Sequence, residues 1–431
     1  MQKLISSLLL LISLFLLLLT MADSSKEFLE SLPPFCPSSP APIIEEKNLT
    51  GADFSLPKQE SAPSQMYAKA YCLLDADTGR VLVGEKENEQ LPMASTTKIM
   101  TCIIALENGN LESKVDISAY AASMPDVQLN MQSGDRFYLK DLLYSLMLES
   151  HNDTAVAIAE HIAGSVENFA KLMNEKAAKL GCTDTQFVTP NGLDAEGHYT
   201  TARELCIIAS YAIQNESFLK IIQTPSHQFS NCKGSRTYSV YNRDAFLTSY
   251  SGAIGIKTGF TGKAGYCFCG AARRDEKTLI TSVLACGWPP NKGYKWVDTK
   301  KLMNYGFKNF NKITLERETL SKTLPVTKGI KNAITIRQTA EESTSLMLSE
   351  KDEITIKYNL PTILKAPIRK GDILGYEEYY LNGELLSQSP IVANETIKKR
   401  DMSYYGEIIK NLFFWNTDSP NNAKTTSTSS S

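Results

Sequence analysis

Ser95 and Lys98 are the residues whose types and spacing most directly suggest chemistry. They lie three residues apart in the stretch ASTTKIMTCIIALENG, and on a helix this spacing places both side chains on one face. The residues after Lys98 are apolar almost all round, so the lysine would lose water, which lowers its pKa. A neutral lysine can take the proton of a serine hydroxyl and activate it as a nucleophile. The alternative is a helix-capping serine beside a lysine that extends to solvent, since Ser-x-x-Lys is common by chance.

Two further polar segments favour the chemical interpretation. Ser150 and Asn152 lie between two apolar helical stretches, where the alternative is that they only cap the next helix. Lys257, Thr258 and Gly259 lie on an expected strand, where the alternative is an ordinary β-hairpin. A cation and a hydroxyl there could bind an anion, and the glycine would let a substrate backbone approach closely. Ser-x-x-Lys, Ser-x-Asn and Lys-Thr-Gly, in this order on helix, turn and strand, form a strong joint signal.

The elements that must hold these residues follow from the apolar periodicity. Strand-like runs flank a turn within residues 66–86, and strands return over residues 252–288. The segment from 95 to about 245 is mostly helical. Strands at both ends with helices between them predict an α/β (α+β) domain over residues 63–315, with one antiparallel sheet under helical layers.

The N-terminal segment differs from the rest of the chain. An apolar run over residues 8–19 follows Lys3 and ends close to Ala22, which predicts a signal peptide over residues 1–22 and therefore export. The alternative is an uncleaved anchor helix, although the run is short for a membrane span. Residues 23–62 are Pro-rich with little periodicity and are predicted to form an extended linker.

The C-terminal part of the chain has another pattern. Residues 318–400 alternate apolar with polar side chains around an Asn382-Gly383 turn, which predicts a small all-β domain. Residues 401–416 follow a Lys-Lys-Arg run and have apolar side chains at helical spacing, which predicts an amphipathic helix suited to an anionic membrane. The alternative is a helix docked on the β domain. Residues 417–431 are low-complexity and expected to be disordered.

Composition excludes several classes of function. The formal net charge is −2 and the body of the chain has no basic block, so nucleic-acid binding has no electrostatic support. The chain has four histidines and no His-Glu-x-x-His motif, so we expect neither a metal site nor a cofactor. Its nine cysteines are odd in number and lie mostly in apolar stretches, which favours free thiols, although a single bridge is an alternative.

The three motifs together resemble the low-molecular-mass penicillin-binding proteins, the serine-type D-alanyl-D-alanine carboxypeptidases. Four segments carry the resemblance: ASTTKIMT, SHNDTAVAIAE, TPNGLDAEGHYTTARELC and GIKTGFTGKAGYCFCGAARR. The similarity is close over residues 66–312 and looser over 318–400. It implies a penicillin-binding hydrolase that removes the terminal D-alanine of the peptidoglycan stem pentapeptide, and β-lactams as covalent inhibitors. It also implies an exported enzyme, peripheral on the outer face of the cytoplasmic membrane through the C-terminal helix.

The resemblance also implies a role for each motif residue. Ser95 forms the acyl-enzyme, Lys98 takes its proton, and the Ser-x-Asn pair relays protons and holds the substrate amide. Lys257 adds positive potential and Thr258 binds the terminal carboxylate, while the backbone N–H groups of Ser95 and Phe260 form the oxyanion hole. The expected catalytic residues are Ser95, Lys98, Ser150 and Asn152, and the expected substrate-binding residues are Lys257, Thr258, Gly259 and Phe260.

One departure and two alternatives accompany this interpretation. His151 stands where the family usually has glycine, and it either adds a titratable group at the rim of the cleft or merely caps the helix. A class A β-lactamase would need a Glu-x-x-Leu-Asn loop, but the comparable region has Glu196 without that pattern. A non-catalytic cell-wall or sporulation protein is the other alternative, against which the intact serine and lysines argue.

Overall fold

The computed structural model describes residues 43–317, 319–320, 322–341 and 343–414. The chain divides into two compact units, a larger one with residues 49–317 and 342–353 and a smaller one with the remaining described residues. The predicted signal peptide and the predicted disordered tail lie outside the described residues.

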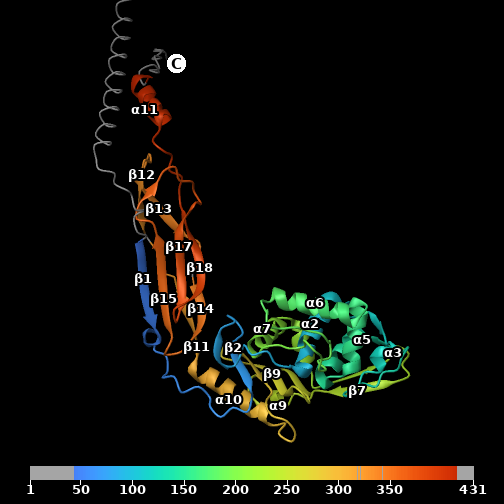
Figure 1. The fold of residues 1–431 in the computed structure, drawn as a ribbon. Coiled ribbons are helices and arrows are strands. Elements are labelled where there is room, and N and C mark those ends of the chain that lie inside the picture. The colour runs from blue at the N-terminus through green and yellow to red at the C-terminus, as the bar shows by residue number, and fades with distance from the viewer. Residues whose placement is uncertain (1–42, 318, 321, 342, 415–431) are drawn as a thin grey trace, which may run out of the picture. The chain divides into compact units, whose positions relative to one another are not determined.

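The larger unit is built on a five-stranded antiparallel sheet with the order β3-β2-β10-β9-β8 (Figure 1). The strands are β2 Ala70–Asp75, β3 Val81–Glu85, β8 Ala253–Thr261, β9 Gly265–Arg274 and β10 Lys277–Leu284. Strands from the two ends of the predicted catalytic domain therefore lie side by side, as the sequence predicts. Every residue of the central strand β10 is buried, because helices cover both faces of the sheet.

The alternation of side chains along β2 explains how two cores form. Cys72 and Leu74 belong to the main core, together with the helices α2 Lys98–Asn108, α5 Asn152–Ala163 and α7 Ala202–Ala212. Tyr71 and Leu73 point to the other face and pack with α10 Tyr294–Asn309. Figure 1 shows α10 across the sheet from α2 and α7.

Shorter elements complete the larger unit. They are the helical turns η1 Gly51–Phe54, η2 Ala94–Thr97 and η3 Ser145–Glu149, the helices α3 Ala119–Ala122, α4 Leu139–Tyr144, α6 Val166–Lys179, α8 Glu216–Gln223 and α9 Phe246–Ser249, and the strand pairs β4 Lys114–Asp116 with β5 Arg136–Tyr138, β6 Ser226–Ser230 with β7 Thr237–Tyr241, and β11 Asn311–Glu316 with β14 Ser343–Leu348.

The smaller unit contains a seven-stranded sheet with the order β1-β15-β17-β18-β13-β12-β16. Its strands are β1 Ile43–Thr50, β12 Thr323–Thr327, β13 Ala333–Gln338, β15 Glu353–Leu360, β16 Leu364–Lys365, β17 Ile373–Leu381 and β18 Glu384–Ala393. The β17–β18 hairpin turns at Asn382-Gly383, both with positive φ. This turn and the all-β character of the unit agree with the predicted fold class. The helix α11 Met402–Phe414 follows the last strand.

One segment differs from its sequence-based expectation. β1 lies inside residues 23–62, where the sequence suggests an extended linker, but it forms an edge strand next to β15. A hydrogen bond from Thr355 Oγ1 to Asn48 Oδ1 (2.7 Å) also links these two strands. Local composition did not reveal β1, because its partner strand lies about 300 residues further along the chain.

The cysteines and the helices of the described residues bear on the expected free thiols and on the alternative of a membrane span. Eight cysteines are described, and all eight are free thiols, seven of them buried. In the described part of the chain, no single helix combines the length and hydropathy of a membrane span; α7 and α8 pass that criterion only together, as a pair bent by 105°.

Candidate active site

Lys98 is fully buried at the start of α2 and lies next to Ser95. Its Nζ atom is 2.9 Å from Ser95 Oγ, 2.8 Å from Asn152 Oδ1 and 2.6 Å from the carbonyl oxygen of Asn191. The last two atoms can only accept hydrogen bonds, whereas the serine hydroxyl can also donate. A neutral lysine has two N–H groups and one lone pair, so this arrangement leaves the lone pair for the serine proton.

The surroundings of Lys98 favour its neutral form. Burial holds the pKa of Lys98 well below its usual range, the positive charge of Lys257 lowers it further, and the Asp153 carboxylate opposes both. The side chain of Asn152 is held by a hydrogen bond from Nδ2 to the carbonyl oxygen of Pro125 (3.1 Å), which directs its Oδ1 atom to the lysine.

Ser150 occupies a strained position between two helical segments. It follows the π-type turn η3 and has φ of 70°, in the left-handed region. Its Oγ atom is buried and has no hydrogen-bond partner among the described residues. An unpaired buried hydroxyl on a residue that lines the same cavity as Ser95 could bond with a substrate atom.

His151 precedes α5, but its side chain makes no capping hydrogen bond. It is buried, with Nδ1 2.8 Å from Ser145 Oγ and Nε2 3.5 Å from Glu149 Oε2. Burial lowers its pKa, and the carboxylates of Asp153 and Glu149 oppose that effect. His151 is thus a buried hydrogen-bonding residue, and its side chain neither caps α5 nor lies exposed at a rim.

Strand β8 brings the third motif against the turn that contains Ser95. Lys257 is buried and donates from Nζ to the carbonyl oxygen of Thr258 (3.0 Å). Burial lowers its pKa to about 8, and the Asp244 carboxylate opposes this effect. A Cβ atom at Gly259 would lie 3.0 Å from the backbone nitrogen of Ser95 and 3.1 Å from Ala94 Cβ. Glycine therefore permits the close approach of β8 to the turn that contains Ser95.

Two adjoining cavities share Ser95, Val127 and Phe260. One, of about 380 Å³, is also lined by Asn152 and by the loop 192–194. The other, of about 300 Å³, contains Ser150, Thr258, Gly259, Glu149, Arg243, Tyr266, Lys295 and Trp296. The eight predicted site residues thus come together, with the two lysines buried and the other six lining the cavities.

Sequence reasoning missed several groups in this site. The Asn191 carbonyl is a backbone group, so no residue pattern could reveal its part in holding Lys98. Arg243 forms an ion pair with Glu149 (2.5 Å) at the edge of the second cavity, from a segment the sequence reading did not single out. Lys295 Nζ lies 4.7 Å from the centre of the Tyr266 ring, and it comes from α10, outside the three motifs.

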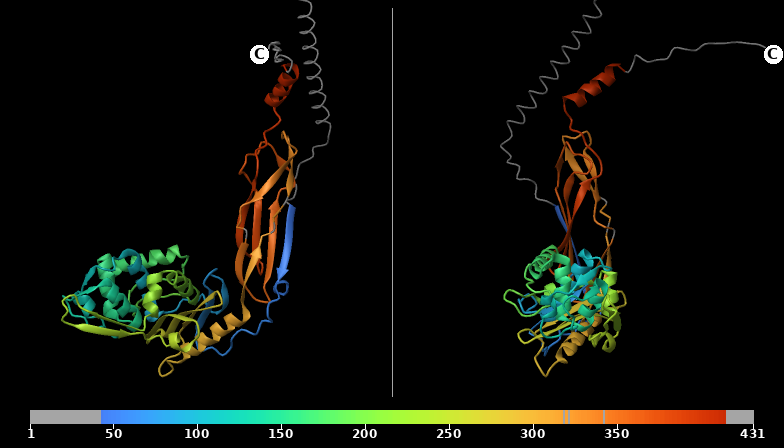
Figure 2. Two further views of the ribbon diagram at one scale, coloured as in Figure 1. Left: turned by 180° about the vertical axis from the view of Figure 1, so that it is seen from behind. Right: turned by 90° about the vertical axis from the view of Figure 1, so that its right-hand side faces the viewer.

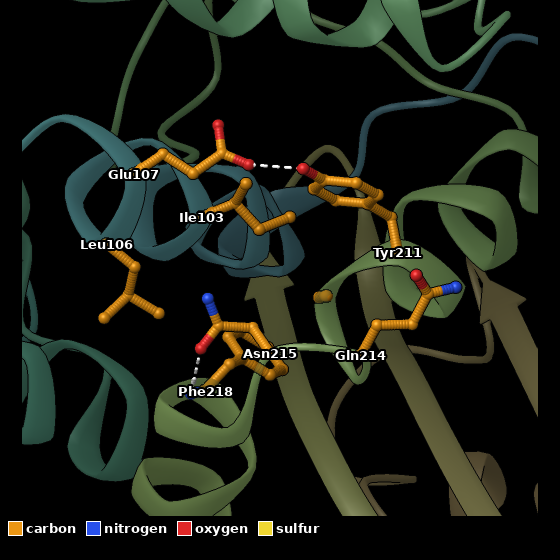
Figure 3. A pocket seen from close by; sticks show the side chains of 8 residues that line it. Ile103, Leu106, Glu107, Tyr211, Gln214, Asn215 and Phe218 are labelled. Atoms are coloured by element: carbon orange, nitrogen blue, oxygen red, sulfur yellow. Dashed lines mark hydrogen bonds between the residues drawn. The ribbon is translucent and has the colours of Figure 1, made fainter.

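A separate cavity of about 220 Å³ lies beside the C-terminal half of α2, between α7 and α8 (Figure 3). It is lined by Ile103, Leu106 and Phe218, and its rim includes Tyr211, which donates to Glu107 Oε1 (2.6 Å). None of the predicted site residues lies in it. Among the described residues, no group of three or more histidine, cysteine or acidic side chains could hold a metal ion.

Comparisons with known proteins agree with this architecture. The sequence model of the D-alanyl-D-alanine carboxypeptidase family matches residues 57–287, and that of the penicillin-binding protein 5 C-terminal domain matches residues 311–399. D-alanyl-D-alanine carboxypeptidase DacF of Bacillus subtilis is 34% identical over 346 residues, which cover 77% of this chain and 86% of DacF. DacC of Escherichia coli is 29% identical over 372 residues, covering 80% of this chain and 88% of DacC.

Solved structures give the same result. Penicillin-binding protein 5 from Haemophilus influenzae superposes with a TM-score of 0.65 at 27% identity, over 79% of this chain and 100% of that one. The Streptomyces K15 DD-transpeptidase has a TM-score of 0.54 at 34% identity, over 57% of this chain and 99% of that one.

This chain belongs to the D-alanyl-D-alanine carboxypeptidase family. It is a serine-type DD-carboxypeptidase and a low-molecular-mass penicillin-binding protein, as the sequence motifs predict. DacF and DacC are both named as carboxypeptidases, which favours this activity over a β-lactamase or a non-catalytic wall protein.

Proposed function

We propose that Ser95 is the nucleophile of the DD-carboxypeptidase reaction and that Lys98 is its general base. The observation that carries this proposal is the position of Lys98 Nζ, fully buried, 2.9 Å from Ser95 Oγ and bonded to two oxygens that cannot donate. Burial and the charge of Lys257 keep the lysine's lone pair available for the serine proton.

The reaction then proceeds in two steps. Ser95 Oγ bonds to the carbonyl carbon between the two terminal D-alanines while its proton moves to Lys98. The backbone N–H groups of Ser95 and Phe260 stabilise the oxyanion, and the C–N bond breaks as the leaving amine receives a proton through Ser150. Water next attacks the acyl-enzyme by the reverse proton path, which releases the shortened peptide and restores Ser95. Asn152 holds the substrate amide.

The terminal carboxylate of the substrate lies near Thr258 in this proposal. Thr258 lines the cavity that also contains Arg243, Glu149 and Lys295, and the buried Lys257 precedes Thr258 on β8. Arg243 is paired with Glu149, so the two lysines supply the net positive charge that suits the negative end of the peptide. Gly259 keeps β8 close to Ser95, so that the carboxylate site and the nucleophile have a fixed separation.

We propose that the enzyme acts outside the cytoplasm, because peptidoglycan lies there, and that residues 1–22 direct its export. In this scheme residues 23–62 connect the export signal to the catalytic domain at 63–315, and the β-rich domain at 318–400 connects that domain to α11. We further propose that α11 lies in the outer surface of the cytoplasmic membrane.

The exposure of α11 supports a surface role over docking on its own domain. Met402 is 83% exposed, Tyr405 49% and Leu412 74%. Both views in Figure 2 show α11 clear of the seven-stranded sheet. An amphipathic helix with apolar side chains left in solvent is suited to the headgroup layer of a bilayer.

Mass spectrometry of the chain lacking residues 1–22, incubated with a soluble pentapeptide and with a penicillin, tests the catalytic proposal. We expect release of one D-alanine per peptide and a penicillin adduct on the tryptic fragment that contains Ser95. We expect Ser95→Ala to fold as the parent does but to give neither product. An adduct on another residue, or D-alanine release by Ser95→Ala at the parent rate, would overturn the assignment.

A further inference from the structure

The end of the seven-stranded sheet from which α11 departs is strongly basic. Three segments that are distant in sequence meet there, residues 328–331, 365–372 and 395–401. They contribute eight exposed cations, which we call the basic end: Lys328, Lys331, Lys365, Arg369, Lys370, Lys398, Lys399 and Arg400. Only the last three belong to the run that the sequence alone associates with the helix.

Backbone contacts fix these segments next to one another. The Gly329 and Lys399 backbones form a bridge, and the Arg400 N–H donates to the carbonyl oxygen of Lys328 (2.8 Å). On the other side, Ile368 and Ile397 form a second bridge, and Lys365 pairs in register with Thr327. The basic end is therefore a property of the folded sheet.

The charge of the basic end is poorly compensated. The three segments contain the carboxylates Asp372, Glu395 and Asp401. Lys331 forms an ion pair with Glu395, whereas the other seven cations form no ion pair with any described residue. Like charges gathered on adjacent segments repel one another, so an anionic partner would stabilise them.

The basic end adjoins the start of α11. Asp401 begins the helix by accepting a hydrogen bond from the Tyr404 N–H (3.1 Å), and it directly follows Arg400. The exposed apolar side chains of α11 therefore directly follow the basic end in the chain, and Figure 1 shows α11 leaving the sheet at the end where β12 and β13 are labelled. Ile373, beside Asp372, is 57% exposed at the same end.

We propose that the basic end binds the anionic lipid headgroups of the membrane that α11 enters, and that the two act as one docking surface. This inference rests on the proposed membrane role of α11 and extends it to the β-rich domain. A single short apolar anchor binds a bilayer only weakly and reversibly, whereas an anchor with a polybasic surface binds stably. The basic end supplies that second contribution, which depends on lipid charge and is weakened by salt.

Vesicle co-sedimentation of the chain lacking residues 1–22 tests the proposal. The vesicles are phosphatidylcholine alone, or phosphatidylcholine and phosphatidylglycerol in equal parts. The basic-end variant carries Lys328→Gln, Lys365→Gln, Arg369→Gln and Lys370→Gln. Each basic residue near an anionic surface contributes about fivefold, so we expect its partition onto the anionic vesicles to fall by at least about tenfold. Binding to neutral vesicles and D-alanine release from a soluble peptide should be unchanged.

A matched control removes the same charge from the larger unit. It carries Gln in place of four exposed lysines, Lys114, Lys179, Lys220 and Lys233. We expect this control to sediment as the parent does. An equal loss in the control and the basic-end variant would overturn the proposal, because only the net charge would then matter. Parent-like binding of the basic-end variant would overturn it as well.

A third variant separates this inference from the proposed role of α11. It carries Ile408→Asn, Ile409→Asn and Leu412→Asn, all at exposed positions. If this variant loses binding while the basic-end variant keeps it, the helix acts alone and the inference fails. If all variants bind as the parent does, the proposed role of α11 fails too. Parent binding to a soluble glycerol-phosphate polymer in preference to anionic vesicles would assign the basic end to the wall and overturn the proposal.

Discussion

The Nζ atom of Lys98 lies 2.9 Å from the Oγ atom of Ser95, and the same lysine is fully buried. The two residues are three apart, so the helical turn that joins them sets the distance. The tertiary fold adds the two oxygens, from Asn152 and Asn191, that occupy the N–H groups of the lysine. The short distance between Ser95 and Lys98 therefore comes from their spacing in the sequence. The groups that favour the neutral form of Lys98 are brought to it by the tertiary fold.

We predict that Lys98→Met slows acylation by penicillin about a thousandfold, because a positioned general base contributes about this factor. The substitution keeps the volume of the side chain, so the fold should survive and non-covalent binding should be retained. Stopped-flow labelling with a fluorescent penicillin measures the acylation rate constant and the initial dissociation constant separately. An unchanged acylation rate constant would show that another group removes the proton.

We predict that kcat/KM falls as the pH rises above about 8, the pKa of Lys257. Lys257 is charged below its pKa, and this charge lowers the pKa of Lys98. In the proposed mechanism the same charge attracts the substrate carboxylate. The Asp244 carboxylate raises the pKa of Lys257, so Asp244→Asn should move the alkaline limb of the pH profile to lower pH by about one unit.

The matched control for that measurement is Asp184→Asn, on the exposed surface. Its pH profile should overlay that of the parent. Asp244 accepts hydrogen bonds from the N–H groups of Phe246 at Oδ1 (2.9 Å) and of Ile256 at Oδ2 (3.1 Å). Asparagine keeps only one acceptor oxygen, so Asp244→Asn retains one of these two bonds and loses the other along with the charge. An alkaline limb that does not move in Asp244→Asn would contradict the coupling between this carboxylate and Lys257.

We predict that Thr258→Val lowers kcat/KM on a peptide with a free D-Ala-D-Ala terminus by about tenfold, the loss of one hydrogen bond to a charged group. On the same peptide with an amidated terminus the loss should be much smaller, since the negative charge is already absent. Assays of both peptides with parent and variant give the ratio directly. Equal losses on the two peptides would mean that Thr258 does not bind the carboxylate.

We predict an acid-sensitive contribution to stability from His198. Its Nδ1 atom accepts the Val188 N–H (3.0 Å), so the ring is neutral, and its Nε2 atom lies 2.8 Å from Thr97 Oγ1 beside the nucleophile turn. Burial lowers the pKa of His198 to about 4. A lowered pKa means that the folded state resists protonation, so the stabilisation is complete above about pH 6.5 and is lost as the pH falls towards 4.

The depression of the His198 pKa corresponds to about 3 kcal/mol between those limits. Urea unfolding at several pH values should therefore give a free energy of unfolding that falls more steeply with acid in the parent than in His198→Gln. His161→Gln, at an exposed histidine, is the control and should keep the slope of the parent. Identical slopes in the parent and His198→Gln would contradict the prediction.

The sequence by itself determined the class of the protein and the order of its motifs. Ser95 and Lys98 are related through one helical turn, and the Lys257-Thr258-Gly259 motif through consecutive positions on one strand, so residue type and spacing were enough. The alternation of strands and helices likewise predicted that the two ends of the catalytic domain share a sheet, and the Asn382-Gly383 turn predicted its hairpin.

The tertiary structure alone decided which distant groups meet these motifs. The Asn191 carbonyl comes to Lys98 from 93 residues away, and Arg243 pairs with Glu149 across a similar separation. β1 joins a sheet whose other strands all lie beyond residue 320, and the basic end gathers cations from three segments. Local spacing cannot encode such contacts, because they depend on how packed elements close long loops and bring their backbones into register.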